Sequence, residues 1–212
     1  MTSREKVAMA VDLRGQPPVP LYYFNERKER SDIFQVEFAE ASDYRFRGTR
    51  RSEWGFVWER LDGTMGQPKD PPLASWDALG DYVAPDPEAP GRFDQVRDFR
   101  DLHPYAYLMG SLGISGFNLV TFLRGFENAM EDLYLERGKL EGLIDMVFGF
   151  EMSLIGHFGE YGLDAVSFAD DWGTQNGLMI SPEQWRAVFK ARYREQFDLV
   201  HSLGMDVYFH SC

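Results

Sequence analysis

The sequence has a single cysteine and no long apolar run. Cys212 cannot form a disulfide within the chain, and no segment approaches the ~20 consecutive apolar residues that a membrane-spanning helix needs. The first twenty residues also lack the apolar stretch of a secretory signal peptide. We therefore expect a cytoplasmic protein in a reducing compartment, without a membrane partner.

Basic residues are also scarce. The chain carries 22 Lys and Arg against 34 Asp and Glu, which gives a formal net charge of -12 at pH 7. A surface of this sign repels a phosphate backbone or an anionic membrane, so nucleic acid is not an expected partner. Apolar residues make up 44% of the chain, which is enough for the core of a large globular domain.

The first part of the chain, residues 1–104, is rich in proline and glycine. It is predicted to be an irregular segment that packs on the main domain, with only short helices such as one over residues 31–41. The segment "SEWGFVWERLDGTMGQP" alternates enough to predict a hairpin that turns at Asp62-Gly63.

From residue 105 the pattern becomes an alternation of strands and helices. "YAYLMGSLG" predicts a buried strand, and residues 117–161 predict a long helical region that is broken near Gly125 or Gly138. "DAVSFADDWG" predicts a second strand, apolar on both faces and ending at two aspartates.

A further helix and strand follow. Ser181 is a natural N-cap and Pro182 suits the first helical position, so a helix is expected to begin here and to end at Gly204. The apolar run "MDVYF" then predicts a third strand, which ends at His210.

Strands that alternate with helices indicate parallel crossovers, as in a doubly wound sheet or a (β/α)8 barrel. The chain has no G-x-G-x-x-G fingerprint after a strand, which disfavours a dinucleotide-binding open sheet. Eight barrel units take about 250 residues, and residues 105–212 contain only three predicted strands. The expected fold is therefore α/β, a (β/α)8 TIM barrel of which residues 105–212 form the first, incomplete part, in one domain overall.

Chemistry-bearing side chains follow two of these strands, where parallel α/β folds place their sites. Asp170 and Asp171 follow one strand, and His210 and Cys212 end the next. Alternate residues of a strand share a face, so His210 and Cys212 are predicted to point together, with α-carbons roughly 6.5 to 7 Å apart. Side chains at that spacing can chelate zinc, although at least one more ligand must come from elsewhere.

Structural interpretations compete with these assignments. A lone cysteine at the end of an apolar strand is usually a small buried hydrophobe, and its histidine a hydrogen-bonded neighbour. Asp170 and Asp171 could instead cap Thr174 or nearby amides.

The segment from "DAVSFADDWGTQNG" through "SPEQW" to "MDVYFHSC" resembles the uroporphyrinogen decarboxylase superfamily. In that superfamily a strand ends in Asp-Asp before a Gly-Thr-Gln loop, a Ser-Pro-Glu starts the next helix, and a later strand ends in His-Ser-Cys. The upstream "EWGFVWERLDGTMGQP" is also similar to one branch, so the resemblance spans about residues 17–212. It implies a (β/α)8 barrel.

One branch of this superfamily consists of corrinoid-linked methyltransferases. The resemblance implies that His210 and Cys212 bind zinc, with a later cysteine beyond residue 212 as a further ligand. Zinc then activates a thiol or methoxyl oxygen, and a methyl group passes between a small methylated substrate and a corrinoid protein. Asp170 and Asp171 are the predicted catalytic residues, and Gln175 and Tyr208 are predicted to bind substrate.

Two alternatives stay open. Uroporphyrinogen decarboxylases, which act in tetrapyrrole biosynthesis, need no metal. They hold the substrate's carboxylates with an N-terminal arginine-rich segment, whereas this chain reads "VPLYYFNERKERSDIFQVEFAEA" in that region. In that case Asp170 or Asp171 faces the pyrrole nitrogens and His210 has a polar, non-metal role. The other alternative is a non-catalytic binding protein on the same barrel.

Overall fold

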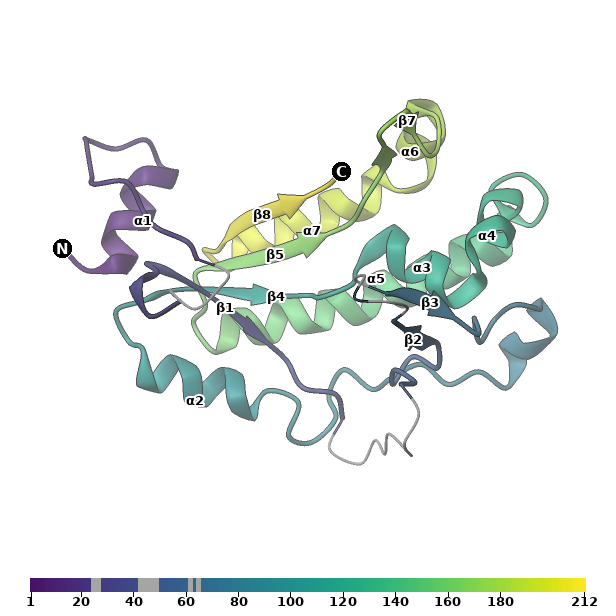
Figure 1. Ribbon diagram of the computed structural model, residues 1–212, viewed down its shortest axis with the longest axis horizontal. Coiled ribbons are helices and arrows are strands. Elements are labelled where there is room, and N and C mark those ends of the chain that lie inside the picture. The colour runs from purple at the N-terminus through teal and green to yellow at the C-terminus, as the bar shows by residue number, and fades with distance from the viewer. Residues whose placement is uncertain (24–27, 42–49, 61–62, 64–65) are drawn as a thin grey trace.

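The computed structural model describes residues 1–23, 28–41, 50–60, 63 and 66–212. Its centre is a four-stranded, wholly parallel sheet in the order β1 (Ile33–Glu37), β4 (Tyr107–Ser111), β5 (Ala165–Ala169) and β8 (Asp206–His210) (Figure 1). The protein is therefore of the α/β class, as the sequence predicts. None of the helices in the described parts of the chain is long and apolar enough to cross a membrane.

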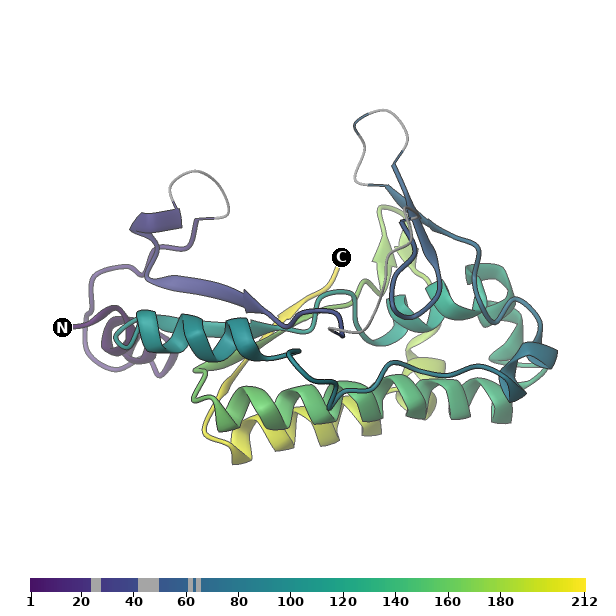
Figure 2. The ribbon, with the colours of Figure 1, turned by 90° about the horizontal axis from the view of Figure 1, so that it is seen from below.

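Three helices connect these strands and lie on the same face of the sheet. They are α2 (Asp94–Leu102), α5 (Arg137–Glu160) and α7 (Lys190–Ser202), and Figure 2 shows α5 and α7 running side by side. On this face Phe34 contacts Phe99 of α2, and Phe168 contacts Phe197 of α7. Leu108 and Val166 join the same large core.

The side chains that alternate with these along the strands point to the opposite face of the sheet. Tyr107, Met109 and Ala165 pack there against Val7 of α1 (Ser3–Val11) in a smaller apolar cluster. The strand order follows the chain without the reversal of a doubly wound sheet. Among the described strands β1 and β8 are the two edges, so closure into the predicted barrel is not shown.

The predicted helix over residues 31–41 is wrong, because this segment forms β1. Val36 is buried and pairs with Gly110 of β4, so pairing with a distant strand overrides the local sequence pattern. Residues 1–104 thus contribute one strand and α2 to the main fold. The predicted hairpin is confirmed as β2 (Val57–Glu59) and β3 (Gln67–Lys69), which pair antiparallel; Asp62 lies outside the described residues.

The long helical region divides as predicted at Gly125, whose φ of 87° suits glycine. The pieces are α3 (Gly116–Arg124), α4 (Phe126–Asp132) and α5, and Gly138 lies inside α5. The Ser181 cap is confirmed, but the predicted single helix is divided at Phe189 into α6 (Pro182–Val188) and α7. Smaller elements are η1 (Lys28–Arg30), η2 (Trp76–Gly80), β6 (Gly173–Thr174) and β7 (Gly177–Leu178).

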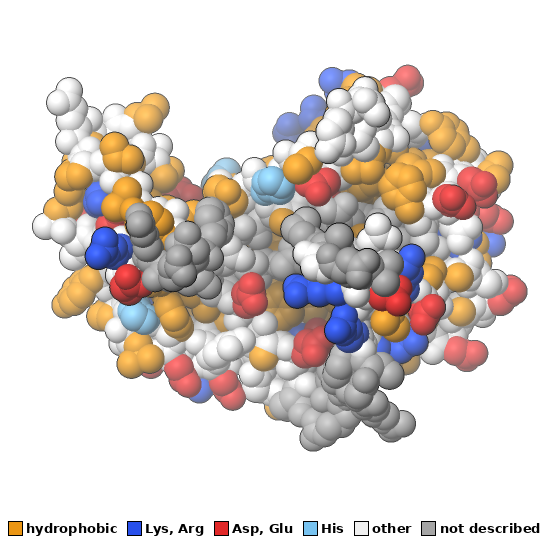
Figure 3. Space-filling model, in the orientation of Figure 1, with side chains coloured by type: hydrophobic (Ala, Val, Ile, Leu, Met, Phe, Trp, Pro, Cys, Tyr) orange, Lys and Arg blue, Asp and Glu red, His pale blue; other side chains and the backbone are white. Residues whose placement is uncertain are grey.

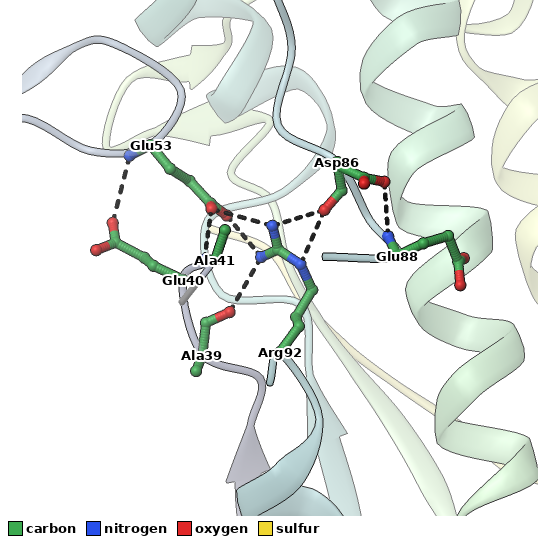
Figure 4. A network of polar contacts seen from close by, with 7 residues as sticks. All are labelled: Ala39, Glu40, Ala41, Glu53, Asp86, Glu88 and Arg92. Carbon is green, nitrogen blue, oxygen red and sulfur yellow. Dashed lines mark hydrogen bonds and ion pairs between the residues drawn. The ribbon is translucent and has the colours of Figure 1, made fainter. Parts of the chain in front are cut away.

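Arg92, a buried arginine just before α2, forms hydrogen bonds with the segment that follows β1 (Figure 4). Arg92 is fully buried, and its guanidinium donates to both carboxylate oxygens of Glu53 at 2.7 and 3.0 Å. It also donates to the carbonyl oxygens of Ala39 and Asp86. One side chain therefore joins three segments that are far apart in the sequence.

We expect Arg92→Met to lower the free energy of unfolding by about 3 to 5 kcal/mol, because it leaves the Glu53 carboxylate buried without its partner. Urea denaturation followed by far-UV circular dichroism measures this. The control is Arg97→Met in α2, since Arg97 is exposed and forms ion pairs with the exposed Asp94 and Asp98. Equal stability of the two variants would contradict the role assigned to Arg92.

Candidate metal centre

The site lies where β5 and β8 end side by side. Ala169 pairs with His210, and three hydrogen bonds continue the contact beyond the strands. The Asp170 amide donates to the His210 carbonyl at 3.1 Å, the Trp172 amide to Ser211 Oγ at 3.3 Å, and the Cys212 amide to Asp171 Oδ1 at 3.0 Å. The two chain segments are therefore fixed relative to one another.

These contacts bring together the potential metal ligands Asp171, His210 and Cys212, which we call the metal-ligand cluster. Their potential donor atoms all lie within 4.8 Å of one another. His210 Nε2 is 3.5 Å from Cys212 Sγ and 3.5 Å from Asp171 Oδ1. The side chains of His210 and Asp171 are 53% and 41% exposed, so solutes can reach the cluster.

The spacing fits a tetrahedral zinc ion. With bonds of about 2.05 Å to nitrogen and 2.3 Å to sulfur, the two ligand atoms lie about 3.6 Å apart, and nitrogen and oxygen ligands lie about 3.4 Å apart. Both separations match those in the cluster. The predicted pair His210 and Cys212 is thus joined by Asp171, which the sequence analysis had assigned to catalysis.

The charge of Asp171 raises the pKa of the Cys212 thiol, and a hydrogen bond between the two side chains adds to the effect. Cys212 is exposed in the structure, whereas the structural interpretation expects it to be buried. The hydrogen-bonded histidine of that interpretation is present, because His210 Nε2 lies 3.5 Å from Cys212 Sγ. A metal ion would favour the thiolate by offsetting the negative charge of Asp171.

Asp170 has a different environment from its neighbour. It is fully buried and accepts hydrogen bonds from the amides of Phe117 and Asn118, at 2.9 and 2.8 Å, and from the Tyr193 hydroxyl. Burial raises the pKa of Asp170 to about 7, against the effect of these hydrogen bonds. Its carboxylate therefore holds the start of α3 and does not face the open cluster.

Glu151 completes this arrangement and is not among the site residues predicted from the sequence. The Gly116 amide donates to it at 2.7 Å and Gln196 Nε2 at 2.6 Å. Burial raises the pKa of Glu151 to about 7. Glu151 and Asp170, which we call the α3 anchor, thus accept from the first three amides of α3. The signal in the sequence was a glutamate within the apolar stripe of α5.

The two predicted substrate-binding residues lie on different elements. Tyr208 is on β8, where strand alternation places it on the same face as His210, and it is 44% exposed. Gln175 is exposed between β6 and β7. In the space-filling view the outline is hollowed between α1 and the end that carries β7 and α6, and histidine and acidic side chains lie at its margin (Figure 3).

An apolar pocket of about 260 Å³ lies near the ends of β5 and β8, and none of the three cluster residues is in its lining. Trp172 and Phe209 in its wall are the chain neighbours of Asp171 and His210; the remaining lining residues are Leu178, Ile180, Pro182, Trp185 and Arg186. A larger hollow, of about 1010 Å³, follows the free edge of β1 and has none of the cluster residues in its lining.

Comparison with solved structures finds a likeness in fold. The structure is similar to that of a methyltransferase from Methanosarcina mazei, with a TM-score of 0.68 and 12% sequence identity, over 100% of this chain and 70% of that chain. This chain shares the fold of that methyltransferase. At this identity the likeness shows the fold alone. No protein-family model matches the chain, and no curated protein matches it in sequence.

The α3 anchor predicts how stability depends on pH. The unfolded chain ionises Asp and Glu near 3.8 and 4.5, whereas the folded chain keeps these protons up to about pH 7. The contribution of these two groups to stability is therefore greatest below about pH 4, falls as the pH rises to about 7, and is level above that. Urea unfolding between pH 4 and 8 measures the slope of the free energy of unfolding against pH.

Glu151→Gln removes one of the two groups and should reduce this slope by about half. Glu195→Gln, at an exposed position of α7, is the control and should leave it unchanged. An unaltered slope in Glu151→Gln would show that the anchor does not titrate in this range.

Proposed function

We propose that the protein is a zinc-dependent methyltransferase that moves a methyl group between a small methylated substrate and a corrinoid protein. The observation that carries this proposal is the cluster of Asp171, His210 and Cys212, in which the separations of the His210 nitrogen from the sulfur and from the carboxylate oxygen fit one tetrahedral ion. The fold shared with a methyltransferase supports it, as does the resemblance carried by the His-Ser-Cys ending.

Zinc bound here would act as a Lewis acid on a substrate thiol or methoxyl oxygen. The residues of this chain would hold the ion with three ligands and leave one tetrahedral position for substrate or for a further ligand. Tyr208 lies on the same face of β8 as His210 and would contact the substrate, as would Gln175 from the β6–β7 loop. The exposure of the cluster leaves room for a protein-borne corrinoid to approach.

We also propose that the sheet is part of the wall of a (β/α)8 barrel. Strands that follow one another in chain order, with their connecting helices on one face, are the arrangement of such a wall. The cluster then lies at the carboxyl ends of the strands, where barrel enzymes carry their active sites.

The decarboxylase alternative is less well supported. It requires an aspartate that faces the pyrrole nitrogens, and Asp170 is buried against α3 and α7. Asp171 is then the one available carboxylate of the pair. A non-catalytic binding protein would have no need of three preformed metal ligands in an accessible position.

Metal analysis tests the site directly. After dialysis against zinc we expect about one ion per chain, and its loss in His210→Ala and in Cys212→Ala, because two ligands hold zinc weakly. Asp171→Asn should weaken binding in a competitive chelator titration. The control is His201→Ala, at an exposed histidine of α7. Zinc content unaffected by any of the three cluster substitutions would refute the metal site.

Transfer from methylcobalamin to a small thiol tests the reaction, with loss of the cobalt–methyl absorbance as the signal. His210→Ala and Cys212→Ala should lower the rate by more than about 100-fold, since a bound metal supplies several kcal/mol of stabilisation. His201→Ala should retain the rate of methyl transfer of the unsubstituted protein. Turnover of uroporphyrinogen by metal-free protein, with no methyl transfer, would decide for the decarboxylase.

A further inference from the structure

We propose that Tyr193 is a positioning residue for the metal-ligand cluster and acts through Asp170. This inference rests on the proposed function, because it assumes that Asp171, His210 and Cys212 bind a metal ion. Tyr193 belongs to α7 and is not part of the cluster. Its hydroxyl is connected to the cluster by one carboxylate and the main chain.

The first step is the fixed position of the Tyr193 hydroxyl. Tyr193 is only 3% exposed, and its ring contacts the rings of Phe148, Trp172 and Phe209. The hydroxyl donates to Asp170 Oδ2. Since aromatic packing fixes the ring, the hydroxyl has one orientation relative to β5.

The second step is the position of Asp170 between two elements. Its oxygens accept from α3 on one side and from Tyr193 on the other. A Cβ at position 116 would clash with Asp170 Oδ2 and the Tyr193 hydroxyl, and the φ of 53° at this position also favours glycine. These contacts leave the Asp170 side chain a single conformation.

The third step connects Asp170 to the metal ligands. Its own amide donates to the carbonyl of His210, and the next residue, Asp171, accepts from the Cys212 amide. The carboxylate contacts of Asp170 therefore hold the stretch of main chain that carries Asp171 and that binds the His210 carbonyl, so losing one of them would loosen this stretch. Outer residues that orient metal ligands typically change affinity by about 10- to 100-fold when they are removed.

The other end of the same sheet provides a comparable control, between β4 and β8. The Tyr107 hydroxyl donates to Asp206 Oδ2 at 2.6 Å, and Tyr107 is 5% exposed. Tyr193→Phe and Tyr107→Phe thus each remove one tyrosine–aspartate hydrogen bond, which is buried for Tyr193 and part-buried for Tyr107. A purely structural role predicts similar effects of the two substitutions, whereas a positioning role predicts that only the first changes the metal site.

The experiment is a titration of the protein with Co²⁺, whose visible absorption reports thiolate ligation and coordination geometry, alongside urea unfolding of each variant. We expect similar losses of stability in both variants. Tyr193→Phe should weaken Co²⁺ binding by about 10- to 100-fold and alter the visible spectrum, and Tyr107→Phe should leave affinity and spectrum unchanged.

Equal Co²⁺ affinity and spectra in the two variants would overturn the inference while leaving the metal site intact. Failure of the unsubstituted protein to bind Co²⁺ or Zn²⁺ would instead refute the proposed function and with it this inference. If Tyr193→Phe does not fold, Asp170→Asn decides in the same titration: weakened binding supports the positioning role, and unchanged binding refutes it.

Discussion

The structure around the candidate site depends on two buried carboxylates that accept from the first three amides of α3. Unpaired amides at a helix start need acceptors, and here Glu151 of α5 and Asp170 after β5 supply them. The usual cap residue, Ser115, bonds instead to the main chain of Ala169. The start of α3 is therefore joined to α5, to the end of β5 and, through Tyr193 and Gln196, to α7.

Burying two acids together is costly unless they are protonated or well bonded. Both effects are present, since burial raises the pKa of each to about 7 and each accepts at least two hydrogen bonds. The dependence of stability on pH is a consequence of this arrangement. In return, the two acids hold α3, α5, α7 and the end of β5 in one defined geometry on the helix side of β5 and β8.

The sequence predicts much of this arrangement where the signal is local. The apolar stripe of α5, the Ser181 cap and the meeting of residues after β5 and β8 follow from periodicity and from parallel strands ending at one edge. β1 was missed because its partner strand is distant in the sequence. The contrast between Asp170 and Asp171 was also missed, although neighbouring residues of an extended chain point to opposite faces. Glu151 was not singled out because its partner amide is 35 residues away.

The two aspartates of the Asp-Asp dipeptide point to opposite sides and have different roles: Asp170 stabilises the surrounding structure, and Asp171 belongs to the candidate metal site. Asp170 points to the helix face, where water does not compete for its hydrogen bonds and aromatic rings fix Tyr193. Asp171 points to the opposite, accessible side with His210 and Cys212. An exposed cluster of three side chains would otherwise sample many conformations. Because the main chain of residues 170–172 and 210–212 is held from the buried side, the exposed ligand atoms can stay near the spacing of one ion and still remain open to a substrate.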